Sequence, residues 1–195
     1  MTTWLPHIAG MLALAFTAFS FWWMNWRPGS LQVGGIAHFA AGRAPEKASE
    51  QPNVVVVTLP LILWNSGARP LVVETLRLVG TRDTTIGILS FEATDSHLGI
   101  VRPGENAERD YFYLPLALKA NEIVKKNFVF QQRNTAFVFG NLLYHLHLEV
   151  KISGHRDWLK MRDVELDFRK DENGMKALGL NLVYQVFEYE ARSQA

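Results

Sequence analysis

Cysteine is absent from the 195-residue sequence. Its absence excludes disulfide bonds, thiolate metal ligands, catalytic cysteines and lipid anchors attached through cysteine. The folded chain must therefore be stabilised by packing, hydrogen bonds and ion pairs. About 165 residues follow an apolar N-terminal segment, which is enough for one domain with a sizeable core.

An excess of either charge is also missing, since the chain has 20 basic and 19 acidic residues and a formal net charge of +1. No run of four basic residues occurs, whereas a phosphate-binding surface needs concentrated positive charge. The glycine-rich patterns G-x-G-x-x-G and G-x-x-x-x-G-K-S/T are absent as well. The sequence therefore predicts no nucleic-acid partner, and we expect no bound cofactor.

The sequence begins with a long apolar run, in which no Asp, Glu, Lys or Arg occurs before Arg27. As a helix, residues 4–26 would extend about 33 Å at about 1.5 Å per residue, close to the hydrocarbon thickness of a bilayer. Tryptophan favours the headgroup level of a membrane. The predicted interface anchors are Trp4, Trp22, Trp23 and Trp26. We predict that residues 1–29 form a transmembrane anchor helix, which ends at the Pro28-Gly29 pair.

A cleaved signal peptide is the alternative, and the sequence disfavours it. The first seven residues lack the basic character of a signal peptide, and the apolar run is longer than usual. We therefore expect a retained single-pass anchor in a bacterial inner membrane. The side of the C-terminal domain stays open: Arg27, Arg43 and Lys47 favour the cytoplasm, but exported β domains on single spans are common.

The anchor also carries a stripe of small residues, namely Gly10, Ala13, Thr17 and Ser20. Spacings of three and four place them on one helix face. Small residues let helices approach closely in lipid, where packing drives association. The alternative is that small residues are simply frequent in membrane helices. The stripe predicts a face that packs on helices of other integral membrane subunits.

Beyond the anchor, the pattern predicts a mainly β chain. Residues 30–53 are expected to form a short strand (31–39) and a linker (40–53), and residues 54–195 a β-sandwich domain. Residues 54–64 are apolar on both faces, so we expect a central strand with a bulge or an edge position at Pro60. Strict alternation over 144–152 predicts a half-buried strand, which turns at 153–155 and returns over 164–168. Further strands are expected at 71–79, 85–93, 110–114, 127–132 and 182–189, a turn at 171–174 and a helical turn at 175–180.

Short strands at regular spacing predict an antiparallel β-sandwich. The segment Leu59-Pro60-Leu61-Ile62-Leu63-Trp64-Asn65-Ser66-Gly67, followed by Arg69-Pro70-Leu71-Val72-Val73, resembles a corner of immunoglobulin-like or fibronectin-like domains on bacterial single-pass membrane proteins. The resemblance implies an immunoglobulin-like sandwich. It implies no particular function.

Three polar groups are candidates for chemistry. His145, His147 and Glu149 share one face of a predicted strand, where they form either part of a metal site or a solvated surface. Residues 95–97 read Asp-Ser-His, but adjacent residues diverge in space, so we expect a polar loop rather than a catalytic triad. Residues 171–174 resemble the start of a calcium loop but lack its remaining ligands. We therefore predict no catalytic, metal or cofactor residue.

Two main function classes remain. The first is a non-catalytic accessory subunit of an integral membrane complex, for example respiratory or photosynthetic, in which the helix packs on partner helices and the β domain braces the assembly. The second is a membrane-tethered module that binds a small ligand, a peptide or an envelope polymer. An enzyme that uses a metal at His145 and His147 is the third possibility.

Overall fold

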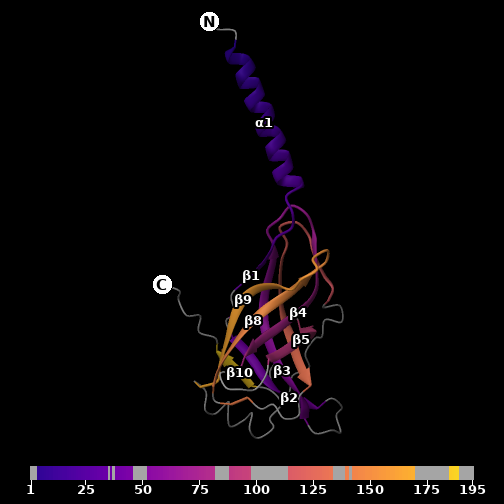
Figure 1. The fold of residues 1–195 in the computed structure, drawn as a ribbon, viewed down its shortest axis with the longest axis vertical. Coiled ribbons are helices and arrows are strands. Elements are labelled where there is room, and N and C mark those ends of the chain that lie inside the picture. Colours follow the sequence, from indigo (N-terminus) through magenta and orange to yellow (C-terminus); the bar gives the residue numbers. More distant parts are fainter. Residues whose placement is uncertain are drawn as a thin grey trace.

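The structure is a computed structural model that describes residues 4–34, 36, 38–45, 52–81, 88–97, 114–133, 139–140, 142–169 and 185–188. One helix, α1 (Leu5–Asn25), is followed by strands. Pro6 lies in the first turn of α1, where its missing N–H removes no helical bond. The helix projects from one end of the β domain, so the molecule is elongated (Figure 1).

The described strands form one ten-stranded antiparallel sheet with the order β10-β2-β3-β7-β5-β4-β8-β9, in which β1 also pairs with β3 and β6 with β4. The strands are β1 (Leu31–Val33), β2 (His38–Pro45), β3 (Pro52–Asn65), β4 (Leu71–Thr81), β5 (Ile88–His97), β6 (Leu116–Leu118), β7 (Ile123–Arg133), β8 (Leu143–Ile152), β9 (Leu159–Asp167) and β10 (Gln185–Glu188). The mainly β prediction is therefore confirmed.

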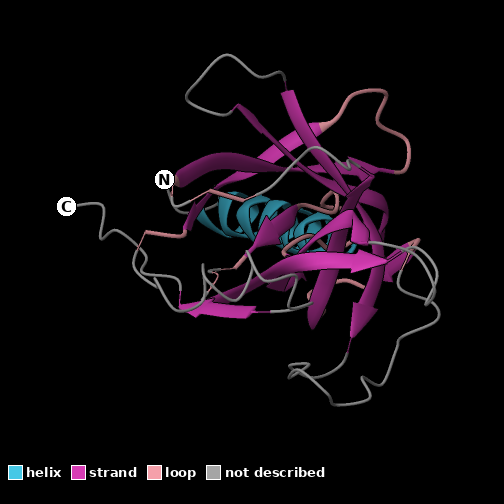
Figure 2. Ribbon diagram, turned by 90° about the horizontal axis from the view of Figure 1, so that it is seen from below, coloured by secondary structure: helices cyan, strands magenta, loops and turns pink. Residues whose placement is uncertain are grey.

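The sheet is strongly curled and nearly barrel-shaped. Seen from the end opposite α1, its strands curve around a common axis (Figure 2). The curl brings β2, the second strand of the order, near the opposite edge strand β9, because the ring of Phe39 in β2 lies 5.3 Å from that of Phe168, which follows β9. The division into two packed sheets that an immunoglobulin-like sandwich requires is not confirmed by this arrangement.

The alternation in β8 and β9 places apolar side chains inside the curl. Tyr144, Leu146 and Leu148 are buried, and so are Val164 and Leu166 opposite them. The register pairs Tyr144 with Leu166 and Leu146 with Val164. The turn between the strands contains Gly154 at φ 85°, a conformation that glycine adopts readily. These predictions from period-two patterning are confirmed.

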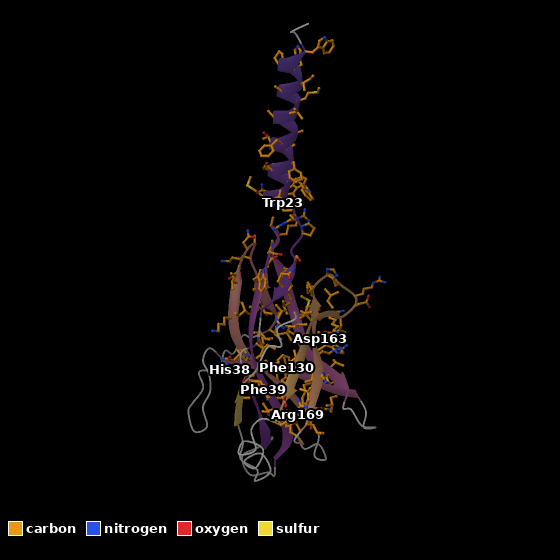
Figure 3. All side chains as sticks on the ribbon, turned by 90° about the vertical axis from the view of Figure 1, so that its left-hand side faces the viewer. Trp23, His38, Phe39, Phe130, Asp163 and Arg169 are labelled. Carbon is orange, nitrogen blue, oxygen red and sulfur yellow. The ribbon has the colours of Figure 1, made fainter. Side chains whose placement is uncertain are left out.

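Aromatic rings fill the end of the core that is far from α1. Phe139 stacks on Phe168 with ring centroids 4.7 Å apart, and Tyr144 meets both rings edge to face. The Tyr144 hydroxyl accepts a hydrogen bond from the Gly140 N–H at 2.8 Å. Phe39 and Phe130 lie inside the domain (Figure 3) and are fully buried. Aromatic side chains therefore make up a large part of the core at this end.

Strand β3 is covered on both faces along its first half, as its apolar sequence predicts. Residues 54–60 are all buried. Val55 and Val57 face the main core, whereas Val54 and Val56 pack with Val129 of β7 on the other face.

Pro60 lies in this central strand without a bulge in the β3–β7 register. On the opposite side, pairing with β2 ends at Thr58 and pairing with β1 begins at Leu63. Ile62 accepts a bond from the Gly34 N–H on that side, and residues two apart in a strand point the same way. The backbone nitrogen of Pro60 therefore faces the gap between β1 and β2, where no described strand pairs with β3. The predicted edge position is correct at this point of β3, and the predicted bulge is not found.

Two local predictions are wrong. Residues 40–45 belong to strand β2 rather than to a linker, because they pair with β3, and Ala40 and Ala41 also pair with β10. Asp95, Ser96 and His97 belong to β5 rather than to a loop, since β5 pairs with β7 through a register shift beside Asp95. The turn at 171–174 and the helical turn at 175–180 lie outside the described residues, as does the strand at 110–114 apart from Leu114.

Candidate membrane anchor and its joint with the β domain

Helix α1 is apolar and exposed along its whole length. Its segment Pro6–Asn25 has a mean hydropathy of 1.4, and none of its residues is buried within the structure. By length and composition, α1 is the one helix among the described residues that can cross a membrane. Trp4 is 74% exposed at one end and Trp26 is 57% exposed just past the other. The structure therefore places the predicted tryptophan anchors at opposite ends of a bilayer-length helix.

The small-residue stripe lies on one face of α1 that no described part of the chain covers. A Cβ atom added at Gly10 would meet no atom within 4 Å. The Thr17 hydroxyl donates to the Ala13 carbonyl at 2.8 Å, so its polarity is satisfied within the helix. The stripe therefore presents a shallow surface of small, largely apolar side chains.

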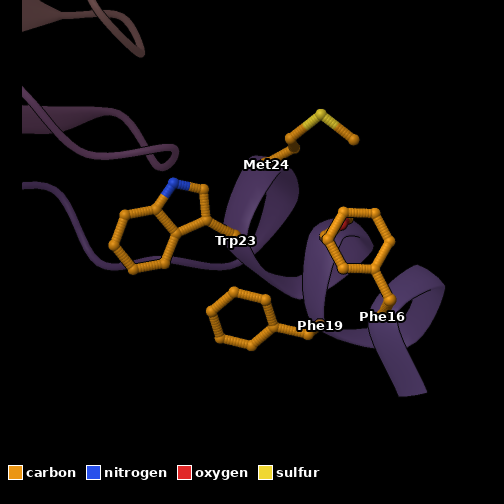
Figure 4. Close-up of a pocket in the computed structure, with 5 residues that line it drawn as sticks. Phe16, Phe19, Trp23 and Met24 are labelled. Carbon is orange, nitrogen blue, oxygen red and sulfur yellow. The ribbon is translucent and has the colours of Figure 1, made fainter. Parts of the chain in front are cut away.

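A hollow around Ser20 interrupts the bulky side chains near the C-terminal end of α1 (Figure 4). It is an open depression of about 410 Å³, lined by Phe16, Phe19, Ser20, Trp23 and Met24. The rings of Phe19 and Trp23 stack with centroids 5.9 Å apart and form one wall. Sequence reasoning assigned Ser20 to the small stripe and missed the hollow. The signal was available, because positions i−4, i−1, i+3 and i+4 surround a helical residue.

Asn65 joins the helix exit to the β domain. Its side chain is completely buried, and its Oδ1 accepts from the Ser30 N–H at 3.1 Å and the Gly67 N–H at 3.0 Å. Its Nδ2 donates to the carbonyls of Arg69 at 2.8 Å and Lys119 at 3.0 Å. One amide therefore ties together three segments, 27–30, 65–70 and 118–122, which we call the joint.

Backbone contacts complete the joint. The Arg27 carbonyl accepts from the N–H groups of Ala68 and Arg69 at 3.1 and 3.2 Å, and the Arg27 guanidinium donates to the Ser66 carbonyl. Gly67 lies directly against Pro28 and Gly29: an added Cβ would overlap the Pro28 carbonyl oxygen and come within 2.5 Å of the Gly29 Cα. The residues after α1 are therefore fixed to the domain.

The sequence pointed to two of the segments that form this joint, but it did not predict the contact between them. The anchor helix was expected to end at Pro28-Gly29, and α1 ends three residues earlier, at Asn25. Residues 65–70, which the resemblance placed at a corner, form the bend between β3 and β4. The Asn-x-Gly pattern contributed to the fold resemblance. Its observed role is to hold the chain that leaves the helix, a contact across 35 residues that no local pattern reports.

A second polar group lies on the outer face of β4, β8 and β9. Arg77 and Glu149 are cross-strand partners, and the Arg77 Nε donates to the Glu149 carboxylate at 2.6 Å. The other Glu149 oxygen lies 3.1 Å from the His147 Nε2. The Arg77 guanidinium also covers the Trp158 ring at 4.0 Å. Glu149 is thus occupied by two partners within the sheet.

The pKa of Glu149 is lowered, which predicts acid sensitivity. Burial by itself raises this pKa, but the hydrogen bond and charge of Arg77, together with His147, outweigh it. The ion pair therefore contributes its full stability above the ordinary Glu pKa of about 4.3, and this contribution is lost as the pH falls through the lower folded-state value. We expect Glu149→Gln to cost about 1 kcal/mol at pH 7 and progressively less below pH ~4.3.

Denaturant titrations of the full chain in detergent at several pH values measure this difference. The matched control is Asp163→Asn, which removes the exposed Lys160–Asp163 pair and should have little effect at any pH. An equal cost of Glu149→Gln at pH 7 and pH 3 would contradict the assignment.

The predicted metal and triad candidates do not assemble into sites in the described part of the chain. Of the described residues, no three His, Asp or Glu side chains are grouped so that they could hold a metal ion. The His145 Nδ1 lies 3.3 Å from a Glu165 carboxylate oxygen, and this contact is separate from the one between His147 and Glu149. The described features with functional character are thus the exposed helix, its hollow and the joint. No protein-family model matches this chain, and a search of curated proteins finds no significant match to it.

Proposed function

We propose that this protein is a non-catalytic, membrane-anchored accessory subunit of a larger integral membrane complex, in the inner membrane of a bacterium. The observation that carries the proposal is the exposure of α1, in which the rest of the chain buries no residue from Pro6 to Asn25. A helix exposed in this way has most of its surface available to lipid and to other helices. In lipid, close packing rather than hydrophobicity drives helix association.

The shape of α1 supports a partner helix on one side. The stripe of Gly10, Ala13 and Thr17 allows close backbone approach, and the hollow at Ser20 continues it toward the domain. Rings flank the hollow and supply large contact area. A side chain from a neighbouring helix can fill this space.

The joint supports a bracing role for the β domain. Because Asn65 and Gly67 hold residues 27–30, the domain cannot swing freely on a flexible linker. A subunit of this kind keeps its domain at a set position relative to the helices on which α1 packs.

Filling the hollow should weaken the assembly. We expect Ser20→Phe to lower the recovery of co-purifying membrane subunits about tenfold, because overpacking a helix contact costs about 1–3 kcal/mol. Purification of the tagged full chain in mild detergent, followed by quantification of stoichiometric companions, measures the effect.

The matched control is Ala18→Phe, which introduces the same ring two residues away on the opposite helix face. Recovery should be unchanged in this variant. If the unmodified protein runs alone in mild detergent, the accessory-subunit proposal is wrong and the tethered binding module becomes the better explanation.

A further inference from the structure

The near-neutral chain conceals an uneven charge distribution. The end of the β domain next to α1 consists of the segments 27–30, 65–70, 118–125 and 153–158, which we call the membrane-proximal end; Ser153 joins it through a bond to the Val72 carbonyl. These segments contain five basic and two acidic residues. The other residues that the structure describes include eight basic and eight acidic residues. Among the described residues, the excess of positive charge therefore lies at the end that carries the helix.

The basic side chains at this end are available to a ligand. Arg69, Lys119, Lys125 and Arg156 are exposed, and in the described part of the chain none of them forms an ion pair. They come from separate turns and strand ends, so the charge is spread over the end of the domain rather than clustered at one point. This distribution suits a planar array of negative groups better than a single small anion.

An exposed apolar side chain lies among these charges. Outside α1 and Trp26, the large apolar side chains exposed in the described domain are Ile123 at 69% and Leu142 at 41%. Ile123 begins β7 opposite Trp64, directly after the joint residue Glu122, whose carbonyl accepts from the Asn65 N–H. Exposed apolar surface beside basic groups is characteristic of proteins that rest on a membrane interface.

The joint holds this end close to the tryptophans of α1. Figure 3 shows Trp23 at the helix end nearest the domain and Arg169 toward the opposite end of the domain. The Arg27 guanidinium lies 4.5 Å from the Trp23 ring centre, so the first basic residue already lies beside the interfacial rings. When α1 spans a bilayer, the membrane-proximal end faces the headgroups.

We infer that the membrane-proximal end of the β domain docks on the bilayer surface, where Arg69, Lys119, Lys125 and Arg156 bind the phosphates of anionic lipids and Ile123 enters the interface. The inference rests on α1 as a membrane span and does not involve partner subunits. Each basic residue near an anionic surface contributes about 1 kcal/mol, which is about fivefold in the ratio of docked to undocked domains.

The absence of cysteine makes a site-specific probe simple. A nitroxide label on Ala120→Cys, an exposed position beside Lys119, reports docking in the full chain reconstituted into vesicles. In vesicles with 30% phosphatidylglycerol we expect its collisions with a water-soluble nickel reagent to fall relative to pure phosphatidylcholine, and high salt should restore them. A label on Leu142→Cys, at the far end of β8, should report the same exposure in both lipids.

A charge-removal pair tests the named residues. Lys119→Gln with Lys125→Gln should lower the docked-to-undocked ratio about 25-fold. The matched control, Arg162→Gln with Arg169→Gln, removes two basic side chains elsewhere and should leave the ratio unchanged. Equal exposure of the label at 120 in both lipids, or an unchanged ratio in the Lys variant, would overturn the inference. Because purified chain alone is used, either result leaves the co-purification test of the accessory-subunit proposal unaffected.

Discussion

Replacing Asn65 with alanine is expected to lower the free energy of unfolding by about 3 kcal/mol. The variant removes one completely buried amide that satisfies two backbone N–H groups and the carbonyls of Arg69 and Lys119. Each backbone group left buried without a partner costs about 1–3 kcal/mol. The loss falls on the joint, so segments 27–30 and 65–70 should open first.

Denaturant titration of the full chain in detergent measures the total loss, and amide hydrogen exchange at Ser30 and Gly67 locates it. Asn65→Asp keeps the shape but replaces the donating Nδ2 with an acceptor that faces carbonyls, so it should be at least as damaging. The matched control is Asn121→Gly in the neighbouring turn, where φ is 56° and the side chain is exposed; glycine should cost little there. An Asn65→Ala variant as stable as this control would show that the amide does not hold the joint.

Gly67→Ala is the second change with a large expected effect. The added methyl group would overlap the Pro28 carbonyl oxygen and lie 2.7 Å from the Pro28 carbonyl carbon, and both are backbone atoms that cannot rotate away. The turn at 65–70 must then separate from residues 28–29. We expect a loss of about 3 kcal/mol, in the range of severe overpacking.

Thermal unfolding in detergent and hydrogen exchange at Ala68, whose N–H bonds to Arg27, measure this separation. Gly140→Ala is the matched control, because its Cβ would make ordinary contacts at 3.5 Å and beyond. If Gly67→Ala and Gly140→Ala melt together, the close packing of the joint does not contribute to stability.

Both changes bear on the proposed function, since the joint is the route by which the helix can position the domain. A variant with a loosened joint would keep its anchor and its core while the domain moved independently. Reduced recovery of partner subunits in Asn65→Ala, with an unchanged stripe and hollow on α1, would indicate that domain position matters to the assembly.

Elements whose environment repeats with a regular period were predictable. The alternation over 144–152 predicts β8 because a half-buried strand exposes every second side chain. The uncharged run before Arg27 predicts α1 in the same way, since every face of a lipid-exposed helix is apolar. The tryptophan anchors follow from the ends of that run.

Features that depend on distant partners were not predictable. Residues 40–45 have the composition of a linker, and they are a strand because β3 pairs with them and β10 pairs with the first two. Asp95 and Ser96 are polar and read as a loop, yet β7 extends β5 through them and Ser96 is fully buried. In each case tertiary pairing outweighs local preference.

The sequence by itself determined that an apolar helix precedes Arg27, that the rest of the chain is mainly β, and that tryptophan lies near both ends of the helix. These properties reside in composition and period, which are local. Only the tertiary structure decided that the sheet curls enough to bring Phe39 into contact with Phe168. It also decided that the Asn65 side chain binds the segment after the helix, and that basic residues far apart in the sequence lie together at the end next to the helix. The physical reason is the same in all three: each depends on contacts between segments far apart in the chain, and such contacts exist only once the strands have paired.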